Sequence, residues 1–354
     1  MASSRAELYA EGTTEVNGNF AGGCREEGGR YNDDLRKRQG VMRTELELTL
    51  DKTAFLGVIL GLVTAFFIGL FMVPRRYVKS DSLTFMVGMT AGAAVGSAAY
   101  WLLAGMPFAH TPAALLSVVI GANWAVGTYA YAAGTRNIGL AKATAIKNTQ
   151  PVVTTIGGFL FFNEAATTNP VFASAGAFLV VVTAYVLSST AHREESVPDA
   201  SLRGYLVPII ASVLYGANGL GMKLLTEYGV PRPQMNLGIG VGAMLGGMGT
   251  YVIVRRRFDF LKAASARDHA LAALGGVVWA VALVTMIVSV AYVGVAVSWA
   301  LLNLSIVISV LYGVIVLKEI DMGRRWRQVI GGLFLAGLGV LALYAAKAMP
   351  ALGR

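Results

Sequence analysis

The chain has very few of the residues on which metal proteins and many enzymes depend. It contains one cysteine, Cys24, so no disulfide and no cysteine-based metal framework can form within a single chain. Its three histidines, His110, His192 and His269, lie too far apart for a metal-ligand spacing. The sequence also lacks a Walker A phosphate loop and a nucleophile elbow. We therefore expect no metal, no cofactor and no enzymatic activity.

Charged residues are scarce as well. Only 14% of the 354 residues are charged, whereas 55% are hydrophobic, a balance that excludes an ordinary soluble domain. Apolar stretches of about 20 residues, long enough to cross a bilayer, recur along the chain. The predicted spans are 54–74, 83–104, 113–133, 140–162, 170–188, 204–225, 233–254, 270–290, 295–317 and 328–346. The sequence thus predicts an all-α, multi-pass protein of the plasma (inner) membrane.

The second half of the chain repeats the first. A shift of 155 residues superimposes 121–164 on 276–319 and matches Gly121 with Gly276, Trp124 with Trp279, Gly139 with Gly294, Asn148 with Asn303, and Glu164 with Glu319. Each half holds five spans, and this odd number means that the second half enters the membrane in the opposite sense. We predict two inverted five-helix repeats, 54–188 and 204–347, joined by a linker at 189–203.

Two further sets of residues match between the halves. Glycine ladders, which let a neighbouring backbone approach closely, predict helix packing in spans 2 and 7. Their members are Gly88, Gly92 and Gly96 in span 2, and Gly238, Gly242 and Gly246 in span 7. Arg76 follows Gly69 by the same spacing that separates Lys223 from Gly216, and both basic residues are candidates for gating or coupling.

Basic residues of the connections predict the orientation. The odd-numbered connections hold fifteen Lys and Arg, whereas the even-numbered ones hold only Arg232. This asymmetry places the odd connections in the cytoplasm and both termini outside, and it explains the net charge of +9 without nucleic acid as a partner. Residues 1–50 are polar and predict a disordered tail. Another interpretation is that Met42 is the native initiator and 1–41 an over-extended reading frame.

No carboxylate occupies the middle of a predicted span. Ten of the 20 Asp and Glu lie at or before Asp51, and the others lie in connections or at span ends. Proton-coupled carriers commonly use an intramembrane carboxylate, so coupling would have to use Glu164 or Glu319. Either these two residues gate or couple transport, or they are solvated residues that end spans 4 and 9. Facilitated diffusion, without a coupling ion, is also open.

Lys147 is the most notable charge inside a predicted span. It lies seven residues into span 4, about 10 Å along a helix, where an unpaired lysine should face the bundle interior or a water-filled cavity. The polar Asn148 follows it, and Pro151 removes a backbone hydrogen bond and bends the helix. We expect this segment to bind substrate. The alternatives are a structural lysine held by polar neighbours, or one that reaches the cytoplasmic face.

Amide and aromatic side chains supply the other candidate binding residues. The matched Asn148 and Asn303 would offer donors and acceptors to a hydroxyl-rich ligand, or would bond neighbouring helices. The indoles of Trp124, Trp279 and Trp299 can stack on a sugar ring, pack the interior or form an interfacial belt. Further candidates are Asn123, Tyr129 and Tyr131 in span 3 and Asn218 in span 6.

The sequence resembles the drug/metabolite transporter superfamily of ten-helix carriers, and more narrowly its glucose/ribose porter family. The matching segments are 121–127 (GANWAVG), 138–143 (IGLAKA) and 161–164 (FFNE), with Gly69, Pro74 and Arg76 in span 1. The resemblance extends over about 54–347 and implies proton-coupled import of a neutral sugar. The chain departs from the family pattern at Lys147 and Asn148, where the porters are typically uncharged.

These observations predict a secondary transporter that moves a small polar metabolite, in the first instance a monosaccharide. Access would alternate to a midplane cavity lined mainly by spans 1, 3, 4, 6, 8 and 9. A second hypothesis is export of amino-acid-like or amphiphilic metabolites, with Lys147 pairing to a substrate carboxylate. A third is a non-transporting membrane receptor or scaffold, against which the short loops argue. The expected partners are the lipid bilayer, a small-molecule substrate and, where transport is coupled, a proton or cation.

Overall fold

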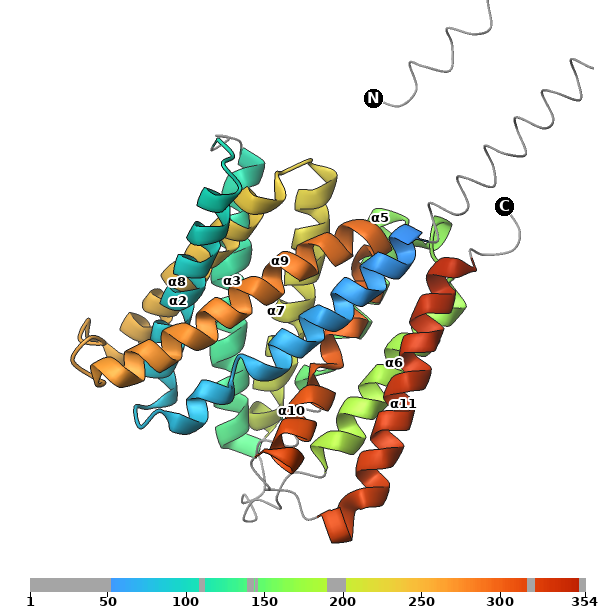
Figure 1. Cartoon of the computed structure of the whole chain (residues 1–354). Helices are drawn as coiled ribbons and strands as arrows, with labels where there is room; N and C mark the ends of the chain where they lie inside the picture. The colour runs from blue at the N-terminus through green and yellow to red at the C-terminus, as the bar shows by residue number, and fades with distance from the viewer. Residues whose placement is uncertain are drawn as a thin grey trace, which may run out of the picture. The chain divides into compact units, whose positions relative to one another are not determined.

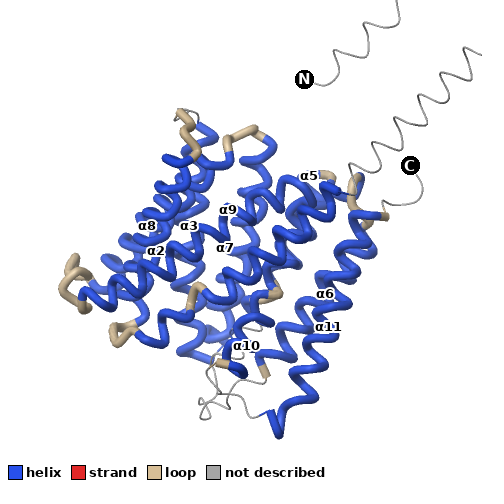
Figure 2. Tube along the Cα trace, in the orientation of Figure 1, coloured by secondary structure: helices blue, strands red, loops and turns tan. Residues whose placement is uncertain are grey.

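The described part of the chain is built from α-helices joined by short connections. The computed structural model describes residues 52–107, 112–138, 143, 146–189, 202–316 and 322–349, and their regular structure is helical throughout (Figures 1 and 2). The helices are a first span, Lys52–Arg75, followed by α2 (Ser82–Leu103), α3 (Pro112–Ile138), α5 (Gln150–Phe162), α6 (Pro170–Ser188), α7 (Leu202–Glu227), α8 (Arg232–Arg255), α9 (Ala266–Asn303), α10 (Ser305–Ile315) and α11 (Met322–Ala348). The predicted tail and most of the predicted linker lie outside the described residues.

Eight of the described helices are long and apolar enough to cross a membrane, and the protein is multi-pass. The sequence predicts ten spans, and the two counts differ at two places. Predicted spans 8 and 9 fall within one stretch of 47 residues, Ala266–Tyr312. Predicted span 4 contains α5, a helix of only 13 residues, which is shorter than a membrane span.

The backbone leaves helical geometry close to both of those places. Gly294 has φ 83° and ψ 169° inside α9, a conformation that side-chain-bearing residues rarely adopt. The sequence predicts a bend of span 140–162 at Pro151, and the chain turns slightly earlier, at Asn148 and Thr149, before α5 begins. Pro151 lies in the first turn of α5. The backbone N–H groups of a first turn have no hydrogen-bond partner within the helix, so the N–H that proline lacks costs no hydrogen bond there. The proline therefore begins a helix instead of bending one.

Glycines allow two helix pairs to approach closely. Gly92 of α2 lies against Ala273 of α9, and a Cβ added to that glycine would collide with the Ala273 backbone. Gly242 of α8 lies in the same way against Val118 of α3. The remaining ladder glycines make similar approaches in the same two pairs: Gly88 and Gly96 on α9, and Gly238 and Gly246 on α3. Helices α2 and α9, and α3 and α8, are thereby packed backbone to backbone.

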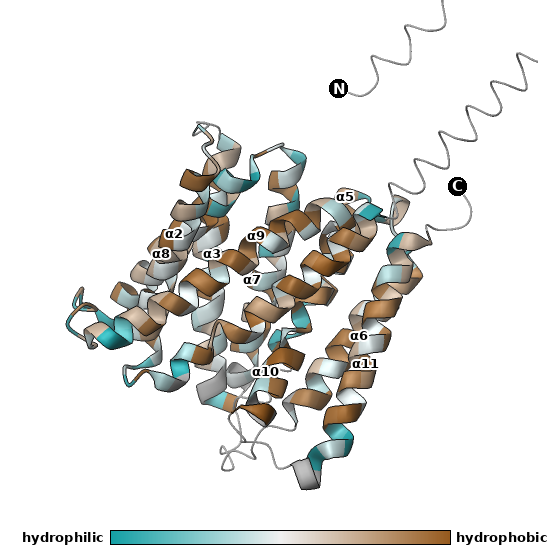
Figure 3. Cartoon of the chain, viewed as in Figure 1, coloured by the Kyte–Doolittle hydropathy of each residue, from teal (hydrophilic) through white to brown (hydrophobic). Residues whose placement is uncertain are grey.

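Apolar side chains cover the outside of the helices, and polar ones are common inside. Leu160, Phe161 and Ile253 are 73%, 74% and 70% exposed, which suits contact with lipid chains. Figure 3 shows hydrophobic residues along the length of the helices and hydrophilic ones mainly near helix ends and connections. Buried polar side chains include Gln234 and Asn236 of α8. The interior is therefore able to bind a polar ligand.

Asp81 begins α2 and provides a first test of the fold. Its carboxylate accepts hydrogen bonds from the Leu83 and Thr84 amides at 3.0 and 3.3 Å and pairs with Arg255 at 3.1 Å. Burial raises the pKa of Asp81, but the hydrogen bonds from Thr84, Arg255 and Leu83 outweigh it and leave the pKa below its ordinary value. The cap therefore stabilises the fold above about pH 4 and is lost as the pH falls through the lowered pKa.

Asp81→Ala is expected to lower the free energy of unfolding by about 1 kcal/mol at pH 7. At pH 3 the free energies of unfolding of the variant and the unsubstituted chain should differ less, because the Asp81 carboxylate of the unsubstituted chain is then losing its charge. Asp81→Asn, which retains a capping oxygen, is the control and should be milder at pH 7. Unfolding in detergent would be followed at both pH values, and an equal loss at pH 7 and pH 3 would contradict this account.

Candidate functional site

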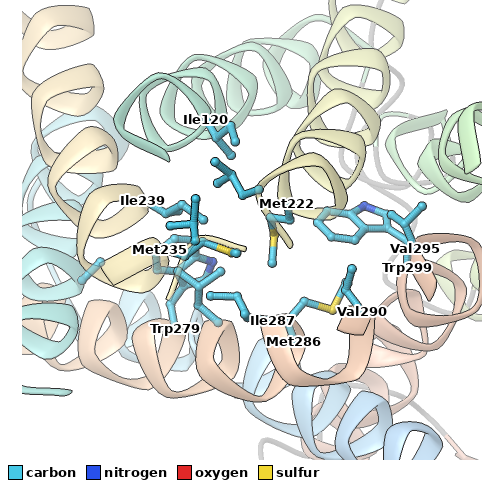
Figure 4. Packing of buried hydrophobic residues seen from close by; sticks show 14 residues of the cluster. Ile120, Met222, Met235, Ile239, Trp279, Met286, Ile287, Val290, Val295 and Trp299 are labelled. Carbon is cyan, nitrogen blue, oxygen red and sulfur yellow. The ribbon is translucent and has the colours of Figure 1, made fainter. Parts of the chain in front are cut away.

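Side chains from α3, α7, α8 and α9 converge in the middle of the bundle. Figure 4 shows Met222 of α7 near Met286 of α9, with the indoles of Trp279 and Trp299 on either side. Trp124 of α3 packs against the same cluster. Methionine is flexible and polarisable, and indoles offer flat apolar faces, so this region can adapt to a ring-shaped ligand.

Trp124 and Trp279 lie against each other at the centre of this region. Their ring centroids are 4.3 Å apart and the ring planes meet at 34°. These two residues occupy matched positions in the two halves of the sequence. The two matched segments therefore meet at this pair.

Trp299 is held in place by a glycine and carries an unsatisfied donor. A Cβ on Gly219 of α7 would lie 2.9 Å from the Trp299 ring and 2.7 Å from Thr154 of α5, so only glycine leaves room for the indole. The Trp299 side chain is 6% exposed, and its Nε1–H has no hydrogen-bond partner among the described residues. Because buried polar groups are nearly always paired, this N–H is available to a ligand or a water molecule.

A second unsatisfied polar atom, which the sequence reasoning missed, belongs to Asn236 of α8. Its side chain is fully buried, and its amide nitrogen donates to the Ala280 carbonyl at 3.4 Å. Its Oδ1 lacks a partner within the described residues. Asn236 follows Met235 of the central cluster, and Ala280 follows Trp279. A polar residue within a predicted span was the available signal, but Asn236 has no matched partner in the first half.

The predicted amide residues form two hydrogen-bond chains between helices. The amide nitrogen of Asn123 donates to Asn218 Oδ1 at 2.6 Å and to the Leu214 carbonyl at 2.8 Å, which joins α3 to α7. Gln150 Nε2 donates to Asn303 Oδ1 at 2.9 Å, and Asn303 Nδ2 donates to the Trp299 carbonyl at 2.8 Å. Part of their bonding capacity is therefore used between helices.

The matched Asn148 and Asn303 have different surroundings. Asn148 is buried in the turn before α5, whereas Asn303 bonds to Gln150, which the sequence reasoning did not propose. Tyr129 of α3 is half-buried, and no ring contact or hydrogen bond of its side chain is recorded in the described part. The substrate-binding roles of these residues stay predictions.

Lys147 lies between two tyrosine rings. Its Nζ is 5.7 Å from the ring centroid of Tyr131 on α3 and 5.7 Å from that of Tyr215 on α7, distances at which a cation is attracted to a ring face. The Tyr215 hydroxyl donates to Thr128 Oγ1 at 2.9 Å. Thr149 and Ser212 hydroxyls are 3.0 Å apart between the adjoining turn and α7. Lys147 thus projects into the bundle interior among hydroxyl groups.

Glu164 is buried against α9 because the residue before it turns the chain at the end of α5. Asn163 adopts a left-handed conformation with φ 49° and ends α5, after which η3 (Glu164–Ala166) begins. The Glu164 carboxylate accepts the Val295 amide at 2.7 Å and the Ala296 amide at 3.1 Å. It therefore caps the helix segment that restarts after Gly294. With 4% exposure, Glu164 is not solvated, and the interpretation of it as a solvated helix end is wrong.

The other predicted gating residues are less informative. Lys223 Nζ pairs with Glu227 at 2.6 Å, one turn further along α7. Arg76 belongs to η2 (Val73–Tyr77), but its side chain is outside the described part of the chain, as is all of Glu319. Across the residues that the structure describes, no group of three His, Cys, Asp or Glu could hold a metal ion.

Comparison with known families and proteins gives consistent results. The family model described as "Sugar transport protein" matches residues 59–345. A Listeria innocua protein named "Putative sugar uptake protein" is 28% identical over 240 residues, covering 66% of this chain and 79% of that protein. A Priestia megaterium protein named "Probable glucose uptake protein GlcU" is 27% identical over 277 residues, covering 74% of this chain and 89% of that protein.

A solved structure has a similar fold. One crystal structure aligns with a TM-score of 0.62 over 82% of this chain and 95% of its own, at 16% sequence identity. At that identity the likeness concerns the arrangement of helices alone.

Proposed function

The chain belongs to the sugar transport protein family and is a sugar uptake transporter, and from that premise we propose how it binds and moves its substrate. The sugar binds in the central region between α3, α7, α8 and α9. The two halves of the protein then rock about this region and expose it to one side of the membrane at a time. The relatives named for sugar or glucose uptake favour import over the export of other metabolites.

One observation carries this assignment of the binding region. The Trp299 Nε1–H is buried without a partner in the described structure, beside a cluster that holds the stacked Trp124 and Trp279. An aromatic face and a free donor are what a sugar ring, with one apolar face and many hydroxyls, requires. The unpaired Oδ1 of Asn236 supplies an acceptor near Trp279.

The proposed architecture is ten membrane helices in two inverted repeats. The 47 residues of Ala266–Tyr312 would measure about 70 Å as one helix, twice what a bilayer core needs. We count these residues as two spans that meet at Gly294, and α5 with the residues before it as one more span. The number of membrane spans then rises from eight to ten.

Reciprocal packing supports the inverted repeat. A Cβ on Gly121 would meet the backbone of Ile239 and Ala243, and a Cβ on its counterpart Gly276 would meet that of Met89 and Ala93. These partner positions lie on the matched glycine-ladder helices α8 and α2. Each half thus contributes a ladder helix to the other half, as two-fold symmetry requires. The repeats would be 54–188 and 204–347, with 1–50 a polar tail.

The proposed orientation places both termini outside. Its support is the concentration of basic residues in alternate connections, such as Arg255, Arg256 and Arg257 after α8. Glu164, Lys223 and Glu227 then lie at the outer end of the bundle. We assign gating, and any proton coupling, to Glu164, because its carboxylate joins α5 to the break in α9.

Trp299→Phe tests the binding region, because it keeps an aromatic ring and removes the N–H. One neutral hydrogen bond contributes about 0.5–1.5 kcal/mol, so binding of D-glucose should weaken by about three- to tenfold. Trp279→Ala, which removes the stacking face, should weaken it further. Binding would be measured by calorimetry on the purified protein, and transport by counterflow of labelled D-glucose in proteoliposomes.

Trp326→Ala is the matched control, since Trp326 of α11 is 46% exposed and far along the sequence from the cluster. It should bind and transport D-glucose as the unsubstituted chain does. If Trp299→Phe and Trp279→Ala also retain full affinity while remaining folded, the sugar binds elsewhere.

A further inference from the structure

Lys147 is a half-buried cation that has no ion pair with any described carboxylate. Its Nζ faces the rings of Tyr131 and Tyr215, and the ion pairs recorded among the described residues join Lys223 to Glu227 and Arg255 to Asp81. A charge inside a membrane bundle is costly unless it is paired or hydrated. Cation–π attraction to the two rings offsets part of that cost, and the ammonium N–H groups donate no hydrogen bond recorded among the described residues.

The remaining described carboxylates are occupied elsewhere. Glu164 accepts the Val295 and Ala296 amides. Asp268 accepts the backbone amides of Lys79 and Ser80, and Asp259 accepts the Tyr251 hydroxyl at 2.9 Å. With Asp81 and Glu227 in their ion pairs, all five described carboxylates have other partners. An anion for Lys147 must therefore come from outside this set.

The lysine faces the same sides of α3 and α7 as the proposed sugar-binding region does. Trp124, Thr128 and Tyr131 are spaced i, i+4, i+7 along one face of α3. Tyr215, Gly219 and Met222 follow the same spacing on α7, and Trp299 packs on that glycine. From Trp124 to Tyr131 the rise along the helix is about 10 Å. A sugar ring near the tryptophans can therefore extend a substituent toward Lys147.

We propose that Lys147 binds a carboxylate on the transported sugar, so that the preferred substrates are acidic monosaccharides of the uronate type. This inference rests on the proposed function of the central region. A uronate keeps the closed ring that stacks on an indole and adds one negative charge. A single lysine matches that single charge, whereas a phosphate dianion is usually held by two or more cations or a bidentate arginine. The Tyr215–Thr128 and Thr149–Ser212 hydroxyls lie nearby to bond the sugar hydroxyls.

The test compares the binding of D-glucuronate, D-glucose and D-glucose 6-phosphate to the purified full-length chain at pH 7. Calorimetry should show D-glucuronate binding at least about tenfold more tightly than D-glucose, the ratio expected for one charged contact. Lys147→Gln should remove that preference, so that D-glucuronate binds no more tightly than D-glucose. Lys262→Gln, at an exposed position between α8 and α9, makes the same charge change and should preserve the preference.

Different failures separate the two proposals. Equal affinity for D-glucuronate and D-glucose in the unsubstituted chain, or a preference for the 6-phosphate, would overturn the carboxylate assignment while sugar binding at the cluster stands. Loss of both sugars in a folded Lys147→Gln chain would also overturn it. Binding of neither sugar by the unsubstituted chain would instead remove the proposed site itself. The relative affinity of the unsubstituted chain for D-glucuronate and D-glucose tests the carboxylate assignment even where a variant does not fold.

Discussion

Glu164→Ala is expected to lower D-glucose uptake by at least about tenfold and to destabilise the protein. The substitution leaves the Val295 and Ala296 amides buried without an acceptor. Each hydrogen bond to a charged group contributes about 1.5–3 kcal/mol, and a buried donor left unpaired adds its own cost. The carboxylate also complements the positive end of the helix segment that begins after Gly294. Both the cap and its electrostatic contribution would be lost together.

Glu164→Gln separates shape from charge. The glutamine oxygen can accept one of the two amides, but its NH2 group faces the other, so uptake should again fall while stability falls less than with alanine. Glu227→Ala is the control, because this carboxylate is exposed and its pair with Lys223 is of a kind that contributes about 0–1 kcal/mol. D-glucose uptake and melting temperature would be measured in parallel for each of these variants. A Glu164→Ala chain that melts and transports like Glu227→Ala would show that the cap has no role.

The position of Glu164 explains why its effect on transport should exceed its effect on stability. Gly158 and Gly294 border the carboxylate, and a Cβ on either would lie within 2.8 Å of it. Gly294 is also the residue at which α9 departs from helical geometry. Glu164 therefore joins the end of α5 to the point at which α9 can bend. In a carrier that alternates between two conformations, such a contact has to form in one and shift in the other.

The helices and their packing faces could be predicted from the sequence because they depend on local patterns. Long apolar stretches define the spans, and the regular spacing of Gly88, Gly92 and Gly96 indicates the close approach that α2 makes to α9. The matched positions of Trp124 and Trp279 drew attention to the pair that stacks at 4.3 Å. The exact limits of the spans were less predictable, because α5 begins only at Gln150, well inside the predicted span 140–162.

Contacts between distant residues could not be predicted in the same way. The bond from Gln150 to Asn303 and the cap from Glu164 to Val295 join residues more than 100 positions apart. Nothing in the local sequence distinguishes a buried glutamate that caps another helix from a solvated one at a helix end. The matched Gly139 and Gly294 were visible, but a glycine pattern alone does not show which glycine has a positive φ. Tyr215, which completes the surroundings of Lys147, had no matched partner to reveal it.

Gly242→Leu is expected to abolish the yield of folded protein, whereas Gly249→Leu should leave it unchanged. Both glycines belong to α8 and lie two turns apart. A Cβ on Gly242 would meet the Val118 backbone, which cannot move away as a side chain can, while a Cβ on Gly249 would meet nothing within 4 Å. Overpacking a well-packed site costs about 1–3 kcal/mol even for small additions, and leucine adds four carbons against a backbone. The two variants have identical composition, so hydrophobicity cannot account for a difference.

The proposed two-fold relation between the halves extends this expectation to Gly92. Gly92 of α2 approaches the Ala273 backbone as Gly242 approaches that of Val118, so Gly92→Leu should fail to the same degree. Size-exclusion chromatography of the detergent-solubilised variants would measure the monodisperse fraction. Loss in Gly242→Leu together with full recovery of Gly92→Leu would argue against reciprocal packing of the halves. Equal behaviour of Gly242→Leu and Gly249→Leu would argue against backbone contact as the reason for the ladder, because Gly242 lies against the Val118 backbone of α3 and Gly249 has no neighbour within 4 Å.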